Sequence, residues 1–237
     1  MNKKYTREEL TKLSALYYRS EKYDLMIEAA KQMIAEDPVL TETEQNIFYE
    51  GYKFKINKQR KSLIKLIEIE RKERKRRSTN IDYISEIKEP AIKALIETAD
   101  DFDTQINIVI PKAKNFAEMI YYYRLKCDFI RYKCQFLSKD ALKEEIKHFE
   151  ETYEKAEKIA NQYLTTYHIR YLELMLTKCV FMYEVENKKN EPIEIAKKLI
   201  IPLKDKEGLD ESTKQIVQIF RSNIIIWSGK CEADVAI

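Results

Sequence analysis

The stretch YYYRLKCDFIRYKCQF at residues 121–136 combines apolar and tyrosine side chains with charges at helical spacing. Asp128, Arg131 and Tyr132 stand at positions i, i+3 and i+4, which share one face of an α-helix. Few residues interrupt such helices, since the chain holds only 3 Gly and 5 Pro among its 237 residues. Tight turns depend on these residue types, so we expect long helices joined by short connections. The stretch therefore predicts one helix of an all-α protein.

The composition of the whole chain indicates the same fold class. Charged residues make up 35% of the chain and hydrophobic residues 44%, a mixture that suits amphipathic helices with one buried stripe. The hydrophobic fraction is too high for a disordered chain. No shift of composition marks a boundary, so we expect a single domain of about nine antiparallel helices at residues 1–229 and a short tail at 230–237.

Caps and breaks predict where the helices begin and end. Thr6 and Glu9 have the spacing of a capping box, which begins the first helix. The Asp-Pro pair at 37–38 ends the second helix, and a threonine at 41 or 43 begins a long third helix that reaches about residue 77. A fourth helix begins near Asp82, and the segment 103–111 is expected to be a loop. Further helices are expected at about 113–137, 140–163, 167–186 and 210–229, with another beginning near Pro192.

The charge balance excludes some function classes. With 43 basic and 40 acidic residues the net charge is +3, which argues against dominant electrostatic binding to nucleic acid or membranes. The run ERKERKRR at 70–77 fits either a nuclear-localisation or nucleic-acid patch, or the solvated C-terminus of a helix. No apolar run approaches the length of a membrane span, about 18 residues, and the first residues lack the apolar core of a secretion signal. We expect a protein of the cytoplasm, with the nucleus as a second location.

Cysteine and histidine usage indicates neither a metal site nor catalysis. The four cysteines form no CxxC pair, and the chain has only two histidines; the cysteines are Cys127, Cys134, Cys179 and Cys231. We expect free, mostly buried thiols in a reducing compartment, with no metal or cofactor. The sequence also lacks a Gly-rich phosphate loop and a nucleophile–base pair at a telling spacing, so we predict that the protein is not an enzyme.

A second stretch, YKFKINKQRKS at 52–62, supplies further cations. Lys53 and Arg60 are seven residues apart, which places them on one face of a helix, two turns apart. Together with Arg131 and Tyr132 they present many hydrogen-bond donors. Such a set suits a phosphoryl group, which carries three acceptor oxygens and a charge of about −1.5 to −2. The prediction requires that the two stretches meet in space.

The order and spacing of several motifs resemble those of the 14-3-3 proteins, adaptors that bind phosphoserine and phosphothreonine. The resemblance covers nearly the whole chain, and its anchors are EKYDLM at 21–26, ETEQNIFYEGYK at 42–53, KCDFIRY at 126–132, VFMYE at 180–184 and FRSNIIIW at 220–227. It implies nine helices in a cup-shaped dimer, with an amphipathic groove in each protomer. By motif match, Lys53, Arg60, Arg131 and Tyr132 bind the phosphate of a partner protein. Arg124 and Asp128 are given a supporting role.

The resemblance also implies a groove wall for the peptide around the phosphate. Its expected residues are Leu176, Thr177, Val180 and Glu184 on the seventh helix, and Ile216, Ile219, Asn223, Ile226 and Trp227 on the ninth. The family has asparagines on both helices that pair with the peptide backbone. Asn223 matches one of them, whereas Thr177 replaces the other and cannot present both the donor and the acceptor of an amide. Plain core packing is the other interpretation of the apolar positions.

Several positions depart from the family pattern. Leu25 replaces an acidic residue of the dimer contact, Leu63 stands where a tryptophan is usual, and Glu173 replaces a small residue near the groove. Leu16 and Ser20 still match the dimer interface, so we expect a homodimer whose contact is weakened. The acidic tail common in the family is replaced by CEADVAI.

The predicted function is therefore that of an adaptor that binds phosphorylated segments of partner proteins and regulates them by sequestration or scaffolding. The alternative is a helical scaffold, or a nucleic-acid-associated protein that uses the basic run 71–77, without dependence on phosphopeptides.

Overall fold

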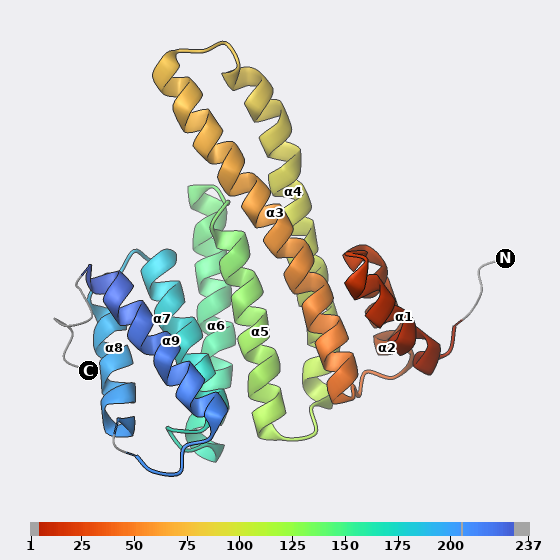
Figure 1. Ribbon diagram of the computed structural model, residues 1–237, viewed down its shortest axis with the longest axis vertical. Helices are drawn as coiled ribbons and strands as arrows, with labels where there is room; N and C mark the ends of the chain where they lie inside the picture. Colours follow the sequence, from red (N-terminus) through yellow and green to blue (C-terminus); the bar gives the residue numbers. More distant parts are fainter. Residues whose placement is uncertain (1–4, 205, 230–237) are drawn as a thin grey trace. The chain divides into compact units, whose positions relative to one another are not determined.

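The computed structural model describes residues 5–204 and 206–229 (Figure 1). All regular secondary structure in these residues is helical, as the sequence predicts. The α-helices are α1 (Arg7–Arg19), α2 (Tyr23–Glu36), α3 (Glu42–Arg76), α4 (Ile81–Val109), α5 (Phe116–Cys134), α6 (Lys139–Tyr163), α7 (Ile169–Glu184), α8 (Glu191–Ile200) and α9 (Glu211–Ser228). Two short 3-10 helices, η1 (Ile110–Lys112) and η2 (Ile201–Leu203), follow α4 and α8.

The contacts of the chain divide it into two compact units, Met1–Lys112 and Ala113–Ile237. The first unit holds α1 to α4 and the second holds α5 to α9. The expected single domain at 1–229 stays a prediction. The expected tail at 230–237 and Cys231 lie outside the described residues.

Two capping boxes begin helices of the first unit. The Thr6 hydroxyl accepts from the Glu9 backbone N–H at 3.3 Å, and the Glu9 carboxylate accepts from the Thr6 N–H at 2.9 Å. Thr41 and Glu44 make the same reciprocal pair at the start of α3. These bonds satisfy backbone donors that a helix N-terminus leaves without intrahelical partners. They confirm the predicted start of the first helix and select Thr41 over Thr43 for the third.

The core of the first unit is built around aromatic rings. Phe48 stacks on Phe102 with ring centroids 5.0 Å apart, and Tyr52 meets Phe102 edge-on at 5.2 Å. These three side chains from α3 and α4 are almost fully buried. Gly51 lets α2 approach closely, since a Cβ at this position would lie 3.3 Å from a side-chain carbon of Ile27. Aromatic packing thus joins α3 to α4, and the small residue joins α3 to α2.

The predicted loop at 103–111 is wrong, because α4 continues to Val109 and η1 follows it. Phe102, Ile106 and Val109 are buried at helical spacing, so the apolar face of α4 continues beneath the polar residues of this segment. Pro90 lies inside α4, which begins nine residues earlier at Ile81. The fifth helix begins later than the predicted residue 113, because the Asn115 side chain caps it by accepting from the Glu118 N–H, and it ends at Cys134, before the predicted residue 137.

The central helix of the second unit is α7. It packs against α5, α6, α8 and α9. Phe149 and Phe181 stack with centroids 3.5 Å apart in this core, and Phe220 of α9 is fully buried. Cys127, Cys134 and Cys179 are free, buried thiols, as expected. Burial raises the pKa of Cys134 and of Cys179 to about 12, so these thiols stay protonated near neutral pH.

The part of the chain that the structure describes contains no helix long and apolar enough to cross a membrane. The same residues include no group of three or more His, Cys, Asp or Glu side chains placed to hold a metal ion.

Candidate functional site

Asp128 links α5 and α7 in the second unit. Its Oδ2 accepts from Arg124 Nη1 at 2.9 Å, one turn earlier on α5. Its Oδ1 lies 3.6 Å from Arg131 Nη2 and accepts from the Thr177 hydroxyl of α7 at 3.5 Å. Asp128 is buried, so these partners compensate the cost of burying its charge. One carboxylate thereby positions two arginines.

Arg131 is held by a second carboxylate. Its Nη1 donates to Glu184 Oε2 at 2.6 Å, and Gln135 Nε2 donates to the same oxygen at 3.2 Å. Burial lowers the pKa of Arg131, but the charges of Asp128, Tyr132 and Glu184 outweigh it and raise the pKa above its ordinary value. The guanidinium therefore stays charged, although its side chain is only 11% exposed. Arg131 Nε is buried and has no hydrogen-bond partner among the described residues.

The two arginines line a hollow of about 310 Å³ in the second unit. Its other lining residues are Asp128 and Tyr132 of α5, Glu173, Leu176, Thr177 and Val180 of α7, and Ile216 and Ile219 of α9. The charged groups come mostly from α5, and the apolar side chains come from α7 and α9. Ile216 is buried in the core, whereas Ile219 is 46% exposed. The hollow is thus amphipathic, with a charged wall and an apolar wall.

Four predicted groove residues do not line this hollow. Glu184 is the partner of Arg131. Trp227 stacks on Tyr183 with ring centroids 5.1 Å apart, which gives it a packing role. Ile226 is 69% exposed. The half-buried Asn223 makes no side-chain hydrogen bond to another described residue, so its amide is available to a ligand.

Lys53 and Arg60 lie on α3, in the first unit. Lys53 Nζ donates to Glu50 Oε1 at 2.9 Å and lies 5.0 Å from the centroid of the Tyr49 ring. Arg60 Nη1 donates to Asn57 Oδ1 at 3.1 Å. Both side chains are half-buried on one helical face. That they meet Arg131 and Tyr132 stays a prediction.

The residues expected at the dimer contact lie on the surface of the first unit. Leu16 is 57% exposed on α1, and Ser20 at its C-terminal end is exposed as well. The Ser20 hydroxyl donates to the Leu16 carbonyl oxygen at 2.8 Å. Tyr18 and Leu25 add further exposed apolar surface nearby in sequence.

The basic run lies at the end of α3. Arg74 pairs with Glu70 at 2.7 Å, and Arg76 pairs with Glu73 at 3.3 Å. The helix ends at Arg76, and its C-cap residue Arg77 has a left-handed φ of 52°. Cations at a helix C-terminus interact favourably with the helix dipole. Part of the basic run thus stabilises the C-terminal end of α3, in agreement with the solvated-terminus interpretation.

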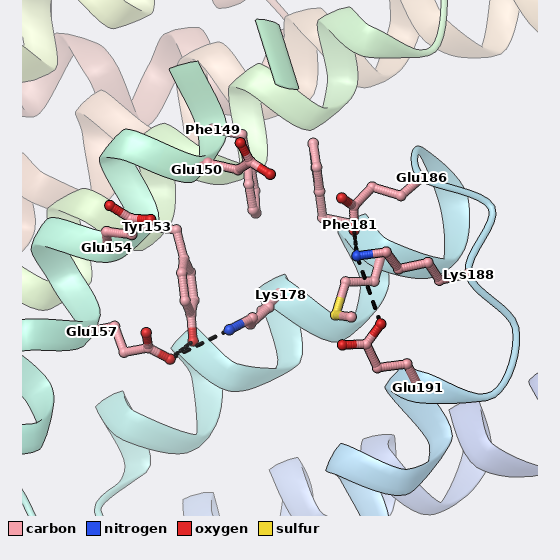
Figure 2. A pocket seen from close by; sticks show the side chains of 11 residues that line it. Phe149, Glu150, Tyr153, Glu154, Glu157, Lys178, Phe181, Glu186, Lys188 and Glu191 are labelled. Carbon is pink, nitrogen blue, oxygen red and sulfur yellow. Dashed lines mark hydrogen bonds and ion pairs between the residues drawn. The ribbon is translucent and has the colours of Figure 1, made fainter. Parts of the chain in front are cut away.

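Sequence reasoning missed a second hollow in the second unit, of about 290 Å³ (Figure 2). Buried Phe149, Tyr153 and Phe181 lie among five glutamates and two lysines there; the charged residues are Glu150, Glu154, Glu157, Glu186, Glu191, Lys178 and Lys188. Lys178 lies 3.5 Å from Glu157 and 4.6 Å from the Tyr153 ring centroid. Because this hollow joins α6, α7 and α8, no contiguous motif marked it.

Sequence reasoning also missed the environment of Tyr121 on α5. The guanidinium carbon of Arg124 lies 5.2 Å from the centroid of its ring, and that of Arg170 lies 4.4 Å from it. Arg170 in turn donates to Glu173 at 2.8 Å. The i, i+3 spacing of Arg170 and Glu173 was the available signal.

The fold and the hollow define a class: an all-α protein with an amphipathic hollow in its second unit. The family model described as 14-3-3 protein matches residues 13–228. A 14-3-3-like protein of Nicotiana tabacum is 30% identical over 95% of this chain and 92% of its own length, and 14-3-3 protein 7 of Solanum lycopersicum has the same identity and coverage. Protein BMH2 of Saccharomyces cerevisiae is 28% identical over 94% of this chain and 85% of its own length.

The chain therefore belongs to the 14-3-3 family. Proteins of this family are adaptors rather than enzymes, and membership implies that the chain binds partner proteins.

Proposed function

We propose that this protein is a phosphoserine- and phosphothreonine-dependent adaptor. It binds phosphorylated segments of partner proteins and regulates them by sequestration or scaffolding. Lys53, Arg60, Arg131 and Tyr132 hold the phosphate, while Arg124 and Asp128 support Arg131. Family membership supports the adaptor role, and the chemistry of the hollow supports the choice of ligand.

The observation that carries the proposal is the state of Arg131. Its guanidinium is mostly buried, fixed by Asp128 and Glu184, and leaves Nε without a hydrogen-bond partner in the described part of the chain. The charged guanidinium lines the hollow, where a phosphate oxygen can accept from it. Arginine binds phosphate oxygens through a planar fork of donors.

The charges around Arg131 support a role for further cations in the proposed site. Arg124 and Arg131 face two carboxylates, Asp128 and Glu184, so this group has no net charge. A phosphate dianion requires additional positive charge, which Lys53 and Arg60 supply in the proposed site. Removing Lys53 should therefore weaken binding even though Arg131 is intact.

The apolar wall holds the peptide on either side of the phosphate. Leu176 and Val180 of α7 and Ile219 of α9 line the hollow and offer surface for apolar side chains. The Asn223 amide pairs with a ligand N–H and C=O. The Thr177 hydroxyl already donates to Asp128, so it contributes less to the peptide backbone.

The test compares a labelled arginine-rich peptide with and without one phosphoserine, by fluorescence anisotropy. We expect binding that depends on the phosphate, abolished by Lys53→Glu and weakened by Arg131→Ala at least about tenfold, since charge-assisted hydrogen bonds contribute about 1.5–3 kcal/mol. The affinity of Arg131→Lys should lie between those of the unmodified protein and Arg131→Ala, because lysine keeps the charge but loses the planar fork of donors.

The matched control is Lys58→Glu. Lys58 lies on the same helix, is exposed, and is five residues from Lys53, about 140° around α3. The same charge reversal there should leave phosphopeptide binding nearly unchanged. Equal binding of the two peptides to the unmodified protein would contradict the proposal, and so would equal losses from Lys53→Glu and Lys58→Glu.

A further inference from the structure

A carboxylate shares the hollow with the two arginines. Glu173 of α7 lines it together with Arg124 and Arg131. Glu173 Oε2 accepts from Arg170 Nη1 at 2.8 Å, and 23% of the glutamate side chain remains exposed. Its Oε1 accepts no hydrogen bond from the described residues. Glu173 therefore keeps one oxygen available to a ligand in this hollow.

The contacts between α5 and α7 locate Glu173 relative to Arg131. Asp128 contacts Thr177, and Arg131, which comes later on α5, contacts Glu184, which comes later on α7. The two helices therefore run in the same direction. At a rise of 1.5 Å per residue along the axis of α7, Glu173 lies about 6 Å before Thr177 and about 16 Å before Glu184. An extended peptide advances about 3.3–3.6 Å per residue. In an extended ligand whose phosphate is bound by Arg131, the residue that lies level with Glu173 is therefore about two to five positions from the phosphoresidue.

The cations near Glu173 already have carboxylate partners. Arg124 is paired with Asp128 at 2.9 Å, and Arg170 is paired with Glu173 itself. Both guanidinium groups flank the ring of Tyr121, which restricts their movement toward a ligand. An acidic ligand residue at this level would meet Glu173 and would have to compete for paired cations. A lysine or arginine would instead gain the free oxygen of Glu173.

We propose that Glu173 determines the charge specificity of the hollow. It favours phosphopeptides that carry lysine or arginine at the position that passes it, and it disfavours aspartate or glutamate there. This inference rests on the proposed phosphopeptide binding. Because the carboxylate is partly exposed, the discrimination is modest, about three- to fivefold between a cation and a neutral residue. It decreases as salt rises.

The test is a charge scan of one phosphoserine peptide. A single Lys, Gln or Glu is placed in turn at each of five positions on either side of the phosphoserine, and dissociation constants are measured by anisotropy. With the unmodified protein we expect one position at which Lys binds more tightly than Gln and Glu binds more weakly. In the Glu173→Gln variant, the ratio of the affinities for the Lys peptide and the Glu peptide at that position should fall to about 1. Binding should still require the phosphate.

Glu154→Gln is the matched control. Glu154 is an exposed glutamate of α6 that does not line this hollow, so the same substitution should leave the ratio unchanged. A ratio that survives in Glu173→Gln, or that falls equally in Glu154→Gln, overturns the inference while leaving the proposed function intact. If no peptide binds in a phosphate-dependent manner, the proposed function fails and this inference fails with it.

Discussion

At the scale of single residues, Thr177 stands where the family resemblance predicts an asparagine of the groove. Its hydroxyl is committed to Asp128 through a long hydrogen bond of 3.5 Å. We predict that Thr177→Asn strengthens phosphopeptide binding, because an amide adds a donor and an acceptor for the ligand backbone. One added hydrogen bond contributes about 0.5–1.5 kcal/mol, or roughly two- to twelvefold in Kd. Titration calorimetry with one phosphopeptide measures the change.

Thr177→Val is the companion variant, since it keeps the shape and removes the hydroxyl. It should leave the affinity equal to or below that of the unmodified protein, because Asp128 loses one of its donors. A Thr177→Asn variant that binds no more tightly than Thr177→Val would contradict the assignment of this position to the peptide backbone.

At the scale of the elements, Arg7 of α1 connects the start of α3 with the end of α2. Its guanidinium donates to the Glu44 carboxylate at 2.9 Å and to the carbonyl oxygens of Met33 and Asp37, both at 2.9 Å. The hydrogen bond from Arg7, and then those from Thr41, lower the pKa of Glu44 to about 2, although burial opposes this shift. Glu44 thus stabilises the folded state in its charged form.

This pKa shift predicts a pH dependence of stability. Because the pKa of Glu44 is depressed on folding, its contribution is fully present above its unfolded value, near 4.5, and is lost as pH falls toward 2. We expect Glu44→Gln to lower the unfolding free energy by about 2–3 kcal/mol at pH 7. The deficit should shrink between pH 4.5 and 2. Urea unfolding of both proteins across this range tests the prediction.

Glu42→Gln is the control for this measurement, because Glu42 is an exposed carboxylate in the same first turn of α3. Its substitution should cost less than about 0.5 kcal/mol at any pH. A deficit for Glu44→Gln that stays constant from pH 7 to 2 would show that its carboxylate charge does not carry the stabilisation.

The helices also show what local sequence could and could not predict. The capping boxes of Thr6 and Thr41 were predictable, since both partners lie within three residues. The end of α4 was not, because the polar residues around Asp103 conceal a buried face set by Ile106 and Val109. Turn residues are only a local preference, and tertiary burial overrides it.

The same distinction applies to the candidate site. The shared face of Asp128 and Arg131 follows from their spacing and is present in the structure. The pairing of Arg131 with Glu184 joins residues 53 positions apart, and the bond from Thr177 to Asp128 spans 49. No local periodicity encodes such pairs. The family resemblance named these residues for the groove, but their mutual contacts required the fold.

At the scale of the whole molecule, the first unit exposes apolar residues where the family resemblance predicts a contact between two copies of the chain. Leu16 is 57% exposed, and Tyr18 and Leu25 are 45% and 48% exposed. A closed dimer uses the same surface on both copies, so each leucine of the contact is present twice in the interface. By the family resemblance, Leu25 stands in place of an acidic residue at this contact, so we expect the contact to be weakened. We therefore propose a weakened homodimer, which dissociates at a higher protein concentration than a dimer with the acidic residue would.

The prediction is that Leu16→Asp converts this dimer to a monomer. Burying a leucine side chain contributes about 1.5–3 kcal/mol, and two symmetric copies together should raise the dimer Kd at least about 100-fold. Gel filtration with light scattering over a dilution series should give twice the chain mass of 28.4 kDa for the unmodified protein and 28.4 kDa for the variant.

Ile108→Asp, an equal change at a 46% exposed residue of α4, should leave the dimer intact. An unmodified protein that is monomeric at every concentration, or a Leu16→Asp variant that stays dimeric, would contradict the proposed contact. Because every residue of the proposed phosphate site belongs to a single chain, phosphopeptide binding by a single site should persist in the monomeric variant, which separates loss of the dimer from loss of the ligand site.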